Sequence, residues 1–239
     1  MSPSPMPLWK RIVDVGFSLA AMPLLGVCIL LVAILHRFVS PGPLFFMQDR
    51  VGYRGRIFRI WKFRTMDAGT DTKAHQDHFR RLMATNAPMV KLDLQGDARL
   101  IRGARLMRAS GLDELPQLLN VLRGDMSLVG PRPCIPSEYE GYLPSQRLRT
   151  NATPGLTGLW QVSGKNRTTF EEMIRLDILY SATLSPARDL WILLMTLPAV
   201  CGQVRDARKA KAREIAATPE FGAQSALESA PVRQPTVGI

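Results

Sequence analysis

Residues 15–35 read VGFSLAAMPLLGVCILLVAIL, which is 21 residues without a charged side chain. At about 1.5 Å of rise per residue, a helix of this length reaches across the roughly 30 Å hydrocarbon core of a bilayer. The stretch does not fit a cleavable signal peptide, because its apolar part is too long and Pro23 interrupts it. It therefore predicts a membrane element in the N-terminal part of the fold.

Pro23 and the charges on both sides of this run decide how the segment meets the membrane. Proline removes a backbone hydrogen bond and clashes with the preceding turn, so a kink or break is expected. Positive charge favours the cytoplasmic side of a membrane. Lys10 and Arg11 precede the run, and Arg37, Arg50, Arg54, Arg56 and Arg59 follow it. Both observations fit a re-entrant anchor over residues 1–40, broken at Pro23, and a proline-kinked spanning helix stays open at this point, because such helices are tolerated in membranes.

The composition fits one domain with a real core together with a membrane element, since 46% of the 239 residues are hydrophobic. A formal net charge of +11 and a pI of about 10.2 imply an anionic partner. Nucleic acid, anionic lipid headgroups and a phosphorylated substrate all qualify. Cys28, Cys134 and Cys201 are far apart, which argues against a zinc site and a disulfide framework and favours a reducing compartment.

The remaining pattern predicts a mainly α fold with one small β-hairpin, of the α+β class. Residues 44–65 hold two apolar runs separated by Gly52 and Gly55, which is typical of a hairpin. Helices are expected over 71–86, 100–111, 113–123 and 170–184, and a glycine-rich loop over 154–165. Residues 188–202 are apolar but too short to span a bilayer, so they suit a core helix or an amphipathic interfacial helix.

The C-terminal segment, residues 203–239, divides into a basic part and a part without periodicity. The basic part suits an anionic lipid surface and, equally, a solvated helix face. It contains Arg205, Arg208, Lys209, Lys211 and Arg213. Residues 216–239 are rich in Ala, Pro, Ser and Gln, so we expect disorder there.

The stretch 112–133, LDELPQLLNVLRGDMSLVGPRP, places two carboxylates side by side in a strongly basic chain. Pro116 is tolerated only in the first turn of a helix, so the helix begins close to Asp113. One interpretation is structural, because a carboxylate at the positive end of a helix stabilises it by roughly 0.3–1 kcal/mol. The other is chemical, because the same helix end also binds phosphate.

Neighbouring arginines make the chemical interpretation coherent. Arg108, Arg123 and Arg132 flank the pair, and such a field keeps a carboxylate ionised. An ionised aspartate can attack phosphorus and form an acyl phosphate. A second carboxylate beside it can hold Mg²⁺, which bridges phosphate oxygens. The pair is therefore a candidate phosphoryl-transfer site, and the structural interpretation stays open at this point.

Four blocks together resemble the bacterial sugar transferase family, which are monotopic polyprenyl-phosphate sugar-1-phosphate transferases. The blocks are KFRTM (62–66), LDELPQLLNVLRGDMSLVGPRP (112–133), PGLTGLWQVSGK (154–165) and LDILY (176–180), in the family's order and spacing. The resemblance covers about residues 8–202. The chain looks most like the single-domain undecaprenyl-phosphate galactose or glucose phosphotransferases of exopolysaccharide synthesis.

The resemblance implies a membrane-bound transferase with a cytoplasmic catalytic domain over residues 41–202. Asp113 matches the family's nucleophile, which attacks the β-phosphate of a UDP-sugar, releases UMP and carries the sugar phosphate until undecaprenyl phosphate accepts it. Glu114 matches the ligand of the Mg²⁺ cofactor. Further matches that bind substrate phosphate or order the basic network around it are Lys62, Arg108, Arg132 and Asp177.

The block 154–165 matches the nucleotide-sugar loop of the family. The chain departs from the family at three positions, and one of them lies in this block. Trp160 and Gln161 fit a substrate wall or a packed core corner equally well. Lys165 stands where the family usually has arginine, which keeps the charge and loses bidentate phosphate geometry. Met22 replaces the serine that often precedes the breaking proline, and Gly111 replaces a serine before Asp113, so that the neighbouring serine would cap the helix instead.

Two alternatives remain. The departures suit a catalytically inactive member that acts as a membrane scaffold of polysaccharide assembly. The high pI suits nucleic-acid binding, but the uncharged run and the lack of a recognition motif oppose it, so we expect no nucleic-acid partner.

We expect UDP-sugar, undecaprenyl phosphate and anionic membrane lipid as partners. The location implied is the cytoplasmic face of the bacterial inner membrane, at the first step of exopolysaccharide, capsule or O-antigen assembly. The resemblance leaves open a homo-oligomer and contacts with other polysaccharide-assembly enzymes. The choice between galactose and glucose turns on a few hydrogen bonds that the sequence does not specify.

Overall fold

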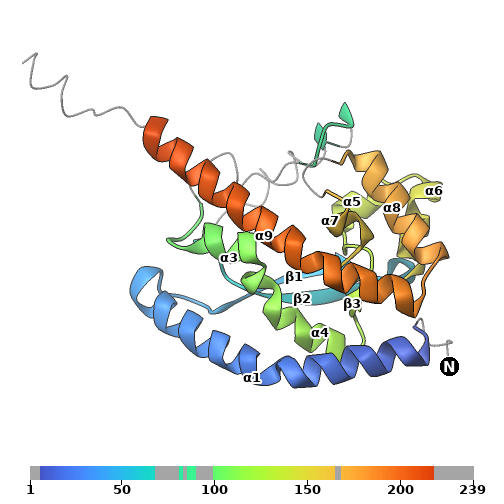
Figure 1. Cartoon of the computed structure of the whole chain (residues 1–239), viewed down its shortest axis with the longest axis horizontal. Helices are drawn as coiled ribbons and strands as arrows, with labels where there is room; N and C mark the ends of the chain where they lie inside the picture. Colours follow the sequence, from blue (N-terminus) through green and yellow to red (C-terminus); the bar gives the residue numbers. More distant parts are fainter. Residues whose placement is uncertain (1–5, 68–80, 83–84, 90–98, 165–167, 218–239) are drawn as a thin grey trace, which may run out of the picture.

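The structure is a computed structural model that describes residues 6–67, 81–82, 85–89, 99–164 and 168–217. It confirms a mainly α fold with a small antiparallel hairpin (Figure 1). The elements are α1 (Leu8–Val39), β1 (Phe45–Val51), η1 (Tyr53–Gly55), β2 (Ile57–Phe63), α3 (Ala104–Ser110), η3 (Leu112–Gln117), α4 (Leu118–Arg123), β3 (Ser127–Val129), α5 (Pro136–Glu140), α6 (Pro144–Arg147), η4 (Leu148–Asn151), β4 (Gly155–Thr157), α7 (Leu159–Val162), α8 (Phe170–Ala182) and α9 (Pro186–Ala217).

The hairpin and most of the predicted helices are confirmed with changed bounds. β1 and β2 pair antiparallel from Phe45 opposite Phe63 to Val51 opposite Ile57. The helix expected over 113–123 is divided into the 3₁₀ turn η3 and the α-helix α4, because Pro116 lacks the N–H that an α-helical interior needs. The helix expected over 71–86 lies largely outside the described residues.

The glycine-rich segment 154–165 is more ordered than the loop that the sequence predicts. It contains β4, which pairs in parallel with β3, followed by the short helix α7. The segments that carry these two strands lie so close together that a Cβ on Gly130, directly after β3, would lie 2.2 Å from the carbonyl oxygen of Thr153. A Cβ on Gly155 would lie 2.1 Å from the amide nitrogen of Gly130, so only glycine fits at either position.

Helix α1 buries polar side chains and exposes apolar ones, which is the reverse of the pattern in a helix surrounded by water. Lys10, Asp14 and Ser18, spaced four residues apart on one helix face, are 2%, 1% and 0% exposed. Apart from that of Arg37, the exposed side chains are apolar and include Leu8, Ile12, Val13, Phe17, Leu19, Leu24, Val27, Leu30, Leu31, Ile34 and Phe38. Within the described part of the chain, α1 is the one helix that is long and apolar enough to cross a membrane. An apolar exterior over polar internal contacts fits a helix surrounded by lipid rather than water.

Pro23 bends α1 without ending it. The helix is continuous from Leu8 to Val39, and Figure 1 shows it changing direction near its middle as it passes around α4 and the hairpin. Proline removes one hydrogen bond and crowds the preceding turn, which accounts for a bend. The break predicted at Pro23 is therefore corrected to a bend within one helix.

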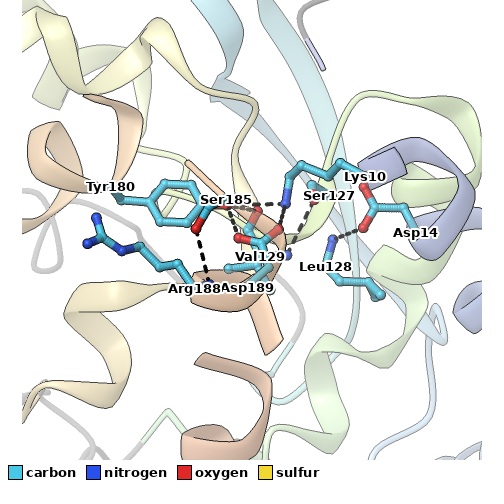
Figure 2. A network of polar contacts seen from close by, with 9 residues as sticks. All are labelled: Lys10, Asp14, Ser127, Leu128, Val129, Tyr180, Ser185, Arg188 and Asp189. Carbon is cyan, nitrogen blue, oxygen red and sulfur yellow. Dashed lines mark hydrogen bonds and ion pairs between the residues drawn. The ribbon is translucent and has the colours of Figure 1, made fainter. Parts of the chain in front are cut away.

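A buried polar network fixes the first turns of α1 to the rest of the molecule (Figure 2). Lys10 forms an ion pair with Asp189 at the start of α9, and its Nζ donates to the hydroxyl of Tyr180 at 3.1 Å. That hydroxyl lies 2.7 Å from the Asp189 carboxylate. Asp14 accepts a hydrogen bond of 2.9 Å from the backbone N–H of Leu128 in β3. Helices α1, α8 and α9 and strand β3 therefore meet at one buried site.

The chain leaving α1 is held by a second anchor. Nε of Arg64, directly after β2, donates to the carbonyl of Pro43 at 2.8 Å. Its Nη1 donates to the hydroxyl of Ser40 at 2.9 Å, and its Nη2 donates to the Ser40 carbonyl. Near the other end, Arg11 donates to the carbonyls of Val121 at 2.5 Å and Leu122 at 2.6 Å, at the end of α4. Both ends of α1 are therefore bound to the same body.

Helix α9 extends well beyond the apolar segment 188–202. It runs without interruption to Ala217. The sequence suggests that the catalytic domain ends at residue 202, inside this helix, and that division stays a prediction. Ile192 is buried, whereas Leu190, Trp191, Leu194 and Leu197 are exposed. Further along, Arg205, Arg208 and Lys209 are also exposed. Disorder is expected over residues 216–239. Ala216 and Ala217 belong to α9 instead, and residues 218–239 lie outside the described part.

Candidate active site

The carboxylate pair lies in the first turn of η3, directly after a left-handed glycine. Gly111 has φ 75°, which explains glycine at this position, and its carbonyl accepts from the N–H of Glu114 at 3.0 Å. Ser110 does not cap η3, because its hydroxyl donates back to Leu106 in α3 at 2.9 Å. Asp113 is buried at 6% exposure, whereas the Glu114 side chain keeps 36%. The two neighbouring carboxylates therefore have different environments.

The KFRTM block provides two contacts to this pair and its surroundings. Element η3 packs against β2, and Nζ of Lys62 lies 2.6 Å from Oε1 of Glu114. Three residues later, Thr65 accepts a hydrogen bond of 3.3 Å from Nη1 of Arg108, in the last turn of α3. Lys62, Arg108 and the carboxylate pair therefore lie at the junction of β2, α3 and η3.

Arg132 and Asp177 are connected through a residue that the sequence did not single out. The carbonyl of Arg132 accepts from Nη2 of Arg149 at 3.0 Å, and Arg149 forms a buried ion pair with Asp177. Nη1 of Arg149 donates to the Tyr142 hydroxyl at 2.7 Å. Burial raises the pKa of the Asp177 carboxyl to about 6, and the Arg149 guanidinium opposes the rise. Asp177, at 1% exposure, therefore acts on the turn around Arg132 from inside the molecule.

Nothing in the local sequence marks Arg149, because a buried arginine and a surface arginine look alike in a segment as short as η4. The sequence indicates a buried polar contact in α8 instead, where Asp177 and Tyr180 are three residues apart and so share one helix face. Both are buried, at 1% and 0% exposure. A charged and a phenolic side chain on the inner face of a helix require internal partners.

The structure decides between the two interpretations of Trp160. The indole is 3% exposed, and its N–H donates to the Thr168 hydroxyl at 2.6 Å, so Trp160 is a core corner rather than a wall of an open site. Gln161 is half-buried, and its amide donates to the carbonyl of Leu156 at 3.0 Å. Lys165 lies outside the described residues.

The donor set fits a Mg²⁺ ion held jointly by protein and substrate. In the described part of the chain, no three His, Cys, Asp or Glu side chains gather at one point. Mg²⁺ is usually bound by one or two carboxylates together with substrate phosphates and water. Glu114 is partly exposed and already holds a cationic group, the ammonium of Lys62, at 2.6 Å. Of the two carboxylates, Glu114 is therefore the one that would hold the metal.

Comparison with known proteins identifies the family of the chain. The chain matches the family model described as bacterial sugar transferase over residues 6–203. It is 41% identical over 201 residues to the UDP-glucose:undecaprenyl-phosphate glucose-1-phosphate transferase of Caulobacter vibrioides, covering 81% of this chain and 70% of that protein.

Two further relatives differ in length. The exopolysaccharide production protein ExoY of Sinorhizobium fredii is 38% identical over 193 residues, covering 80% of this chain and 85% of that protein. The galactosyl transferase CpsE of Streptococcus agalactiae is 39% identical over 195 residues, covering 80% of this chain but 42% of that protein, so the match spans less than half of the streptococcal chain. With a family match over most of its length, the chain belongs to the bacterial sugar transferase family.

Proposed function

We propose that the protein transfers sugar-1-phosphate from a UDP-hexose, galactose or glucose, to undecaprenyl phosphate at the cytoplasmic face of the inner membrane. This would be the first step in assembling the repeat unit of an exopolysaccharide, capsule or O-antigen. The observation that carries the proposal is the carboxylate pair, with Asp113 buried and Glu114 half-exposed beside Lys62. The names of relatives in the family support both the donor and the lipid acceptor.

The transfer takes two steps at one phosphorus. In the first, a carboxylate oxygen of Asp113 bonds to the β-phosphorus of the donor, the bond to the bridging oxygen breaks, and UMP leaves with that oxygen. In the second, an oxygen of undecaprenyl phosphate bonds to the same phosphorus and the Asp113 carboxylate leaves. Lys62, Arg108 and Arg132 stabilise the negative charge of the phosphoryl group in both steps. Mg²⁺ at Glu114 would supply further neutralisation of the phosphate oxygens.

The direct test is UMP release from a panel of UDP-sugars by purified, detergent-solubilised protein with undecaprenyl phosphate and Mg²⁺. We expect turnover with one UDP-hexose, and this would also identify the sugar. Folded protein that turns over no donor in the panel would contradict the proposed function and favour the inactive scaffold.

Lys62 and a metal ion compete for the same carboxylate, so we expect Lys62→Met to bind Mn²⁺ more tightly than wild type when no donor is present. The expected gain is about threefold to tenfold, because the ammonium now 2.6 Å from Glu114 no longer has to be displaced. Electron paramagnetic resonance of free Mn²⁺ measures it. Arg59→Met removes an exposed charge and is the control; equal affinities in all three proteins would contradict this competition.

The buried Asp177–Arg149 pair predicts a pH dependence. Asp177, with a pKa of about 6, is ionised above that pH and neutral below it. Its protonation removes a charge-assisted hydrogen bond to Arg149 and loosens the hold on the Arg132 carbonyl. We expect kcat/KM to fall as pH drops through about 6. Asp177→Asn should be slower at pH 8 and lack this fall, and a variant profile with the same fall would show that another group causes it.

The two anchors of α1 support a re-entrant topology. A straight helix of 32 residues is about 48 Å long and would place its ends on opposite sides of a 30 Å bilayer core. Instead, Lys10 and Arg11 at one end and Ser40 at the other bind residues of the folded domain that follows α1. Such a domain lies on one side of the membrane, and so do both ends of the helix bound to it.

Cysteine labelling tests this topology. We expect cysteines placed at the exposed positions 7 and 41, in a background lacking the exposed Cys201, to react with an impermeant reagent from the cytoplasmic side only. Both positions flank α1 without replacing an anchoring residue. Labelling of the two positions from opposite sides would show a spanning helix.

A further inference from the structure

Arg50 is a buried cation beside the active site that the transfer mechanism does not use. It lies at the end of β1 and is 5% exposed. Its Nη1 donates to the carbonyl of Pro133 at 3.1 Å, and its Nη2 donates to Oε1 of Gln48 at 2.7 Å. Its Nε–H is buried without a hydrogen-bond partner, and none of the carboxylates in the described ranges forms an ion pair with it. A buried charge without an ion pair destabilises a fold, so its presence requires a reason.

The charges around Arg50 favour an anion close by. Burial lowers the pKa of Arg50 to about 10, and repulsion by Arg132 adds to this lowering, while Glu138 and Glu114 oppose it. Glu138 is itself 4% exposed, and its Oε1 has no hydrogen-bond partner, so it compensates Arg50 only through space. An anion next to Arg132 would relieve the repulsion between the two guanidinium groups.

Arg50 also belongs to a set of contacts that fixes the turn of Gly130 to Pro133. Three successive carbonyls after this turn's glycine each accept a hydrogen bond. That of Arg132 accepts from Arg149 at 3.0 Å, that of Pro133 from Arg50 at 3.1 Å, and that of Cys134 from the N–H of Val51 at 2.8 Å. The charge of Arg149 is balanced by its ion pair with a buried carboxylate, whereas Arg50 keeps its positive charge available to the site.

We propose that Arg50 is a positioning residue that holds the Arg132 turn through the Pro133 carbonyl and strengthens binding of the donor's diphosphate with a second, buried positive charge. Arg50 does not touch the substrate, because its own side chain is enclosed. The proposal rests on the proposed function, since the diphosphate is that of the UDP-sugar. Arg50, at the end of β1, would then increase the affinity for the UDP-sugar and would not serve fold stability alone.

Three variants separate charge from structure. Arg50→Met removes the charge and the hydrogen bonds, and Arg50→Lys keeps the charge. Arg59→Met is the matched control, because Arg59 lies on β2 of the same hairpin and its ion pair with Asp49 is at the surface, with side-chain exposures of 63% and 56%. We expect Arg50→Met to raise KM for the UDP-sugar about 10- to 30-fold, Arg50→Lys to raise it less than about threefold, and Arg59→Met to leave it unchanged.

Thermal melting shows whether the effect is one of folding. We expect Arg50→Met to melt within about 5 °C of wild type, because removing an unpaired buried charge offsets the lost hydrogen bonds. A wild-type KM in Arg50→Met, or an equal loss in Arg50→Met and Arg50→Lys, would overturn the proposal. If Arg50→Met does not fold, Arg50→Gln takes its place, since its amide can still donate to a carbonyl, and a wild-type KM there has the same meaning.

A binding measurement keeps this test apart from the test of the proposed function. Wild-type protein without turnover of any UDP-sugar would contradict the proposed function but leave the anion site measurable. Titration calorimetry with inorganic pyrophosphate and Mg²⁺ should then show binding at least about tenfold weaker in Arg50→Met than in wild type. Equal affinities in the two proteins would overturn the role of Arg50.

Discussion

UMP release by the Asp113→Asn variant is expected to fall at least about 10³-fold, because the amide keeps the size of the side chain and lacks the nucleophilic charge. Asp113 is 6% exposed in η3, so a near-isosteric replacement should leave the fold intact. Initial rates with the preferred UDP-hexose, undecaprenyl phosphate and Mg²⁺ give the rate loss. Thermal melting of the same preparation should stay close to that of wild type.

Asp49→Asn is the control for the loss of one carboxylate. Asp49 is exposed on β1, and its ion pair with Arg59 lies at the surface, where such pairs contribute little. We expect wild-type rates in this variant. If Asp113→Asn instead kept more than about a tenth of the wild-type rate, the nucleophile would have to be a different group.

Gly130→Ala is expected to destabilise the protein by about 3 kcal/mol or more and to remove most of the activity. The added Cβ would lie 2.2 Å from the carbonyl oxygen of Thr153 and 2.8 Å from the amide nitrogen of Gly155, so the backbone must move. That movement breaks the 2.9 Å bond from Gly130 N–H to Thr157 and displaces Arg132 two residues later. Melting and initial rates, measured on one preparation, report both effects.

Gly202→Ala in α9 makes the same change where space is available, because a Cβ there meets nothing within 4 Å. Alanine is favoured over glycine in a helix by about 1 kcal/mol, so this variant should be at least as stable as wild type. Its rate should be unchanged. Similar stability of the two variants would show that the backbone around Gly130 does not lie as close to Thr153 and Gly155 as described.

Features with a local physical cause were predicted from the sequence. The uncharged run of residues 15–35 predicts the long apolar helix, and two apolar runs around Gly52 and Gly55 predict the hairpin. The pairing of β3 with β4 was missed, because three-residue strands carry no readable period and are brought together by Gly130 and Gly155. The sequence predicts a break at Pro23, whereas the structure has a bend there, because the helix continues on both sides of the proline.

The candidate site was predicted as a set of residues but not as a set of contacts. Lys62 and Glu114 are 52 positions apart, and only the family resemblance suggested that they meet. Arg50 and Arg149 were missed as internal residues, because their burial depends on packing that no short motif encodes. The spacing of Lys10, Asp14 and Ser18 does carry a signal, since three polar residues four apart at the start of an apolar helix must share one face.

The most direct test of the central claim is to look for the covalent intermediate on Asp113. The protein would be incubated with its UDP-hexose and Mg²⁺ without the lipid acceptor, quenched in acid, digested and examined by mass spectrometry. The account predicts one hexose phosphate on the peptide that contains Asp113, lost when undecaprenyl phosphate is added and absent in Asp113→Asn. Rapid turnover in the full reaction without any adduct on this peptide, or an adduct on another residue, would contradict it.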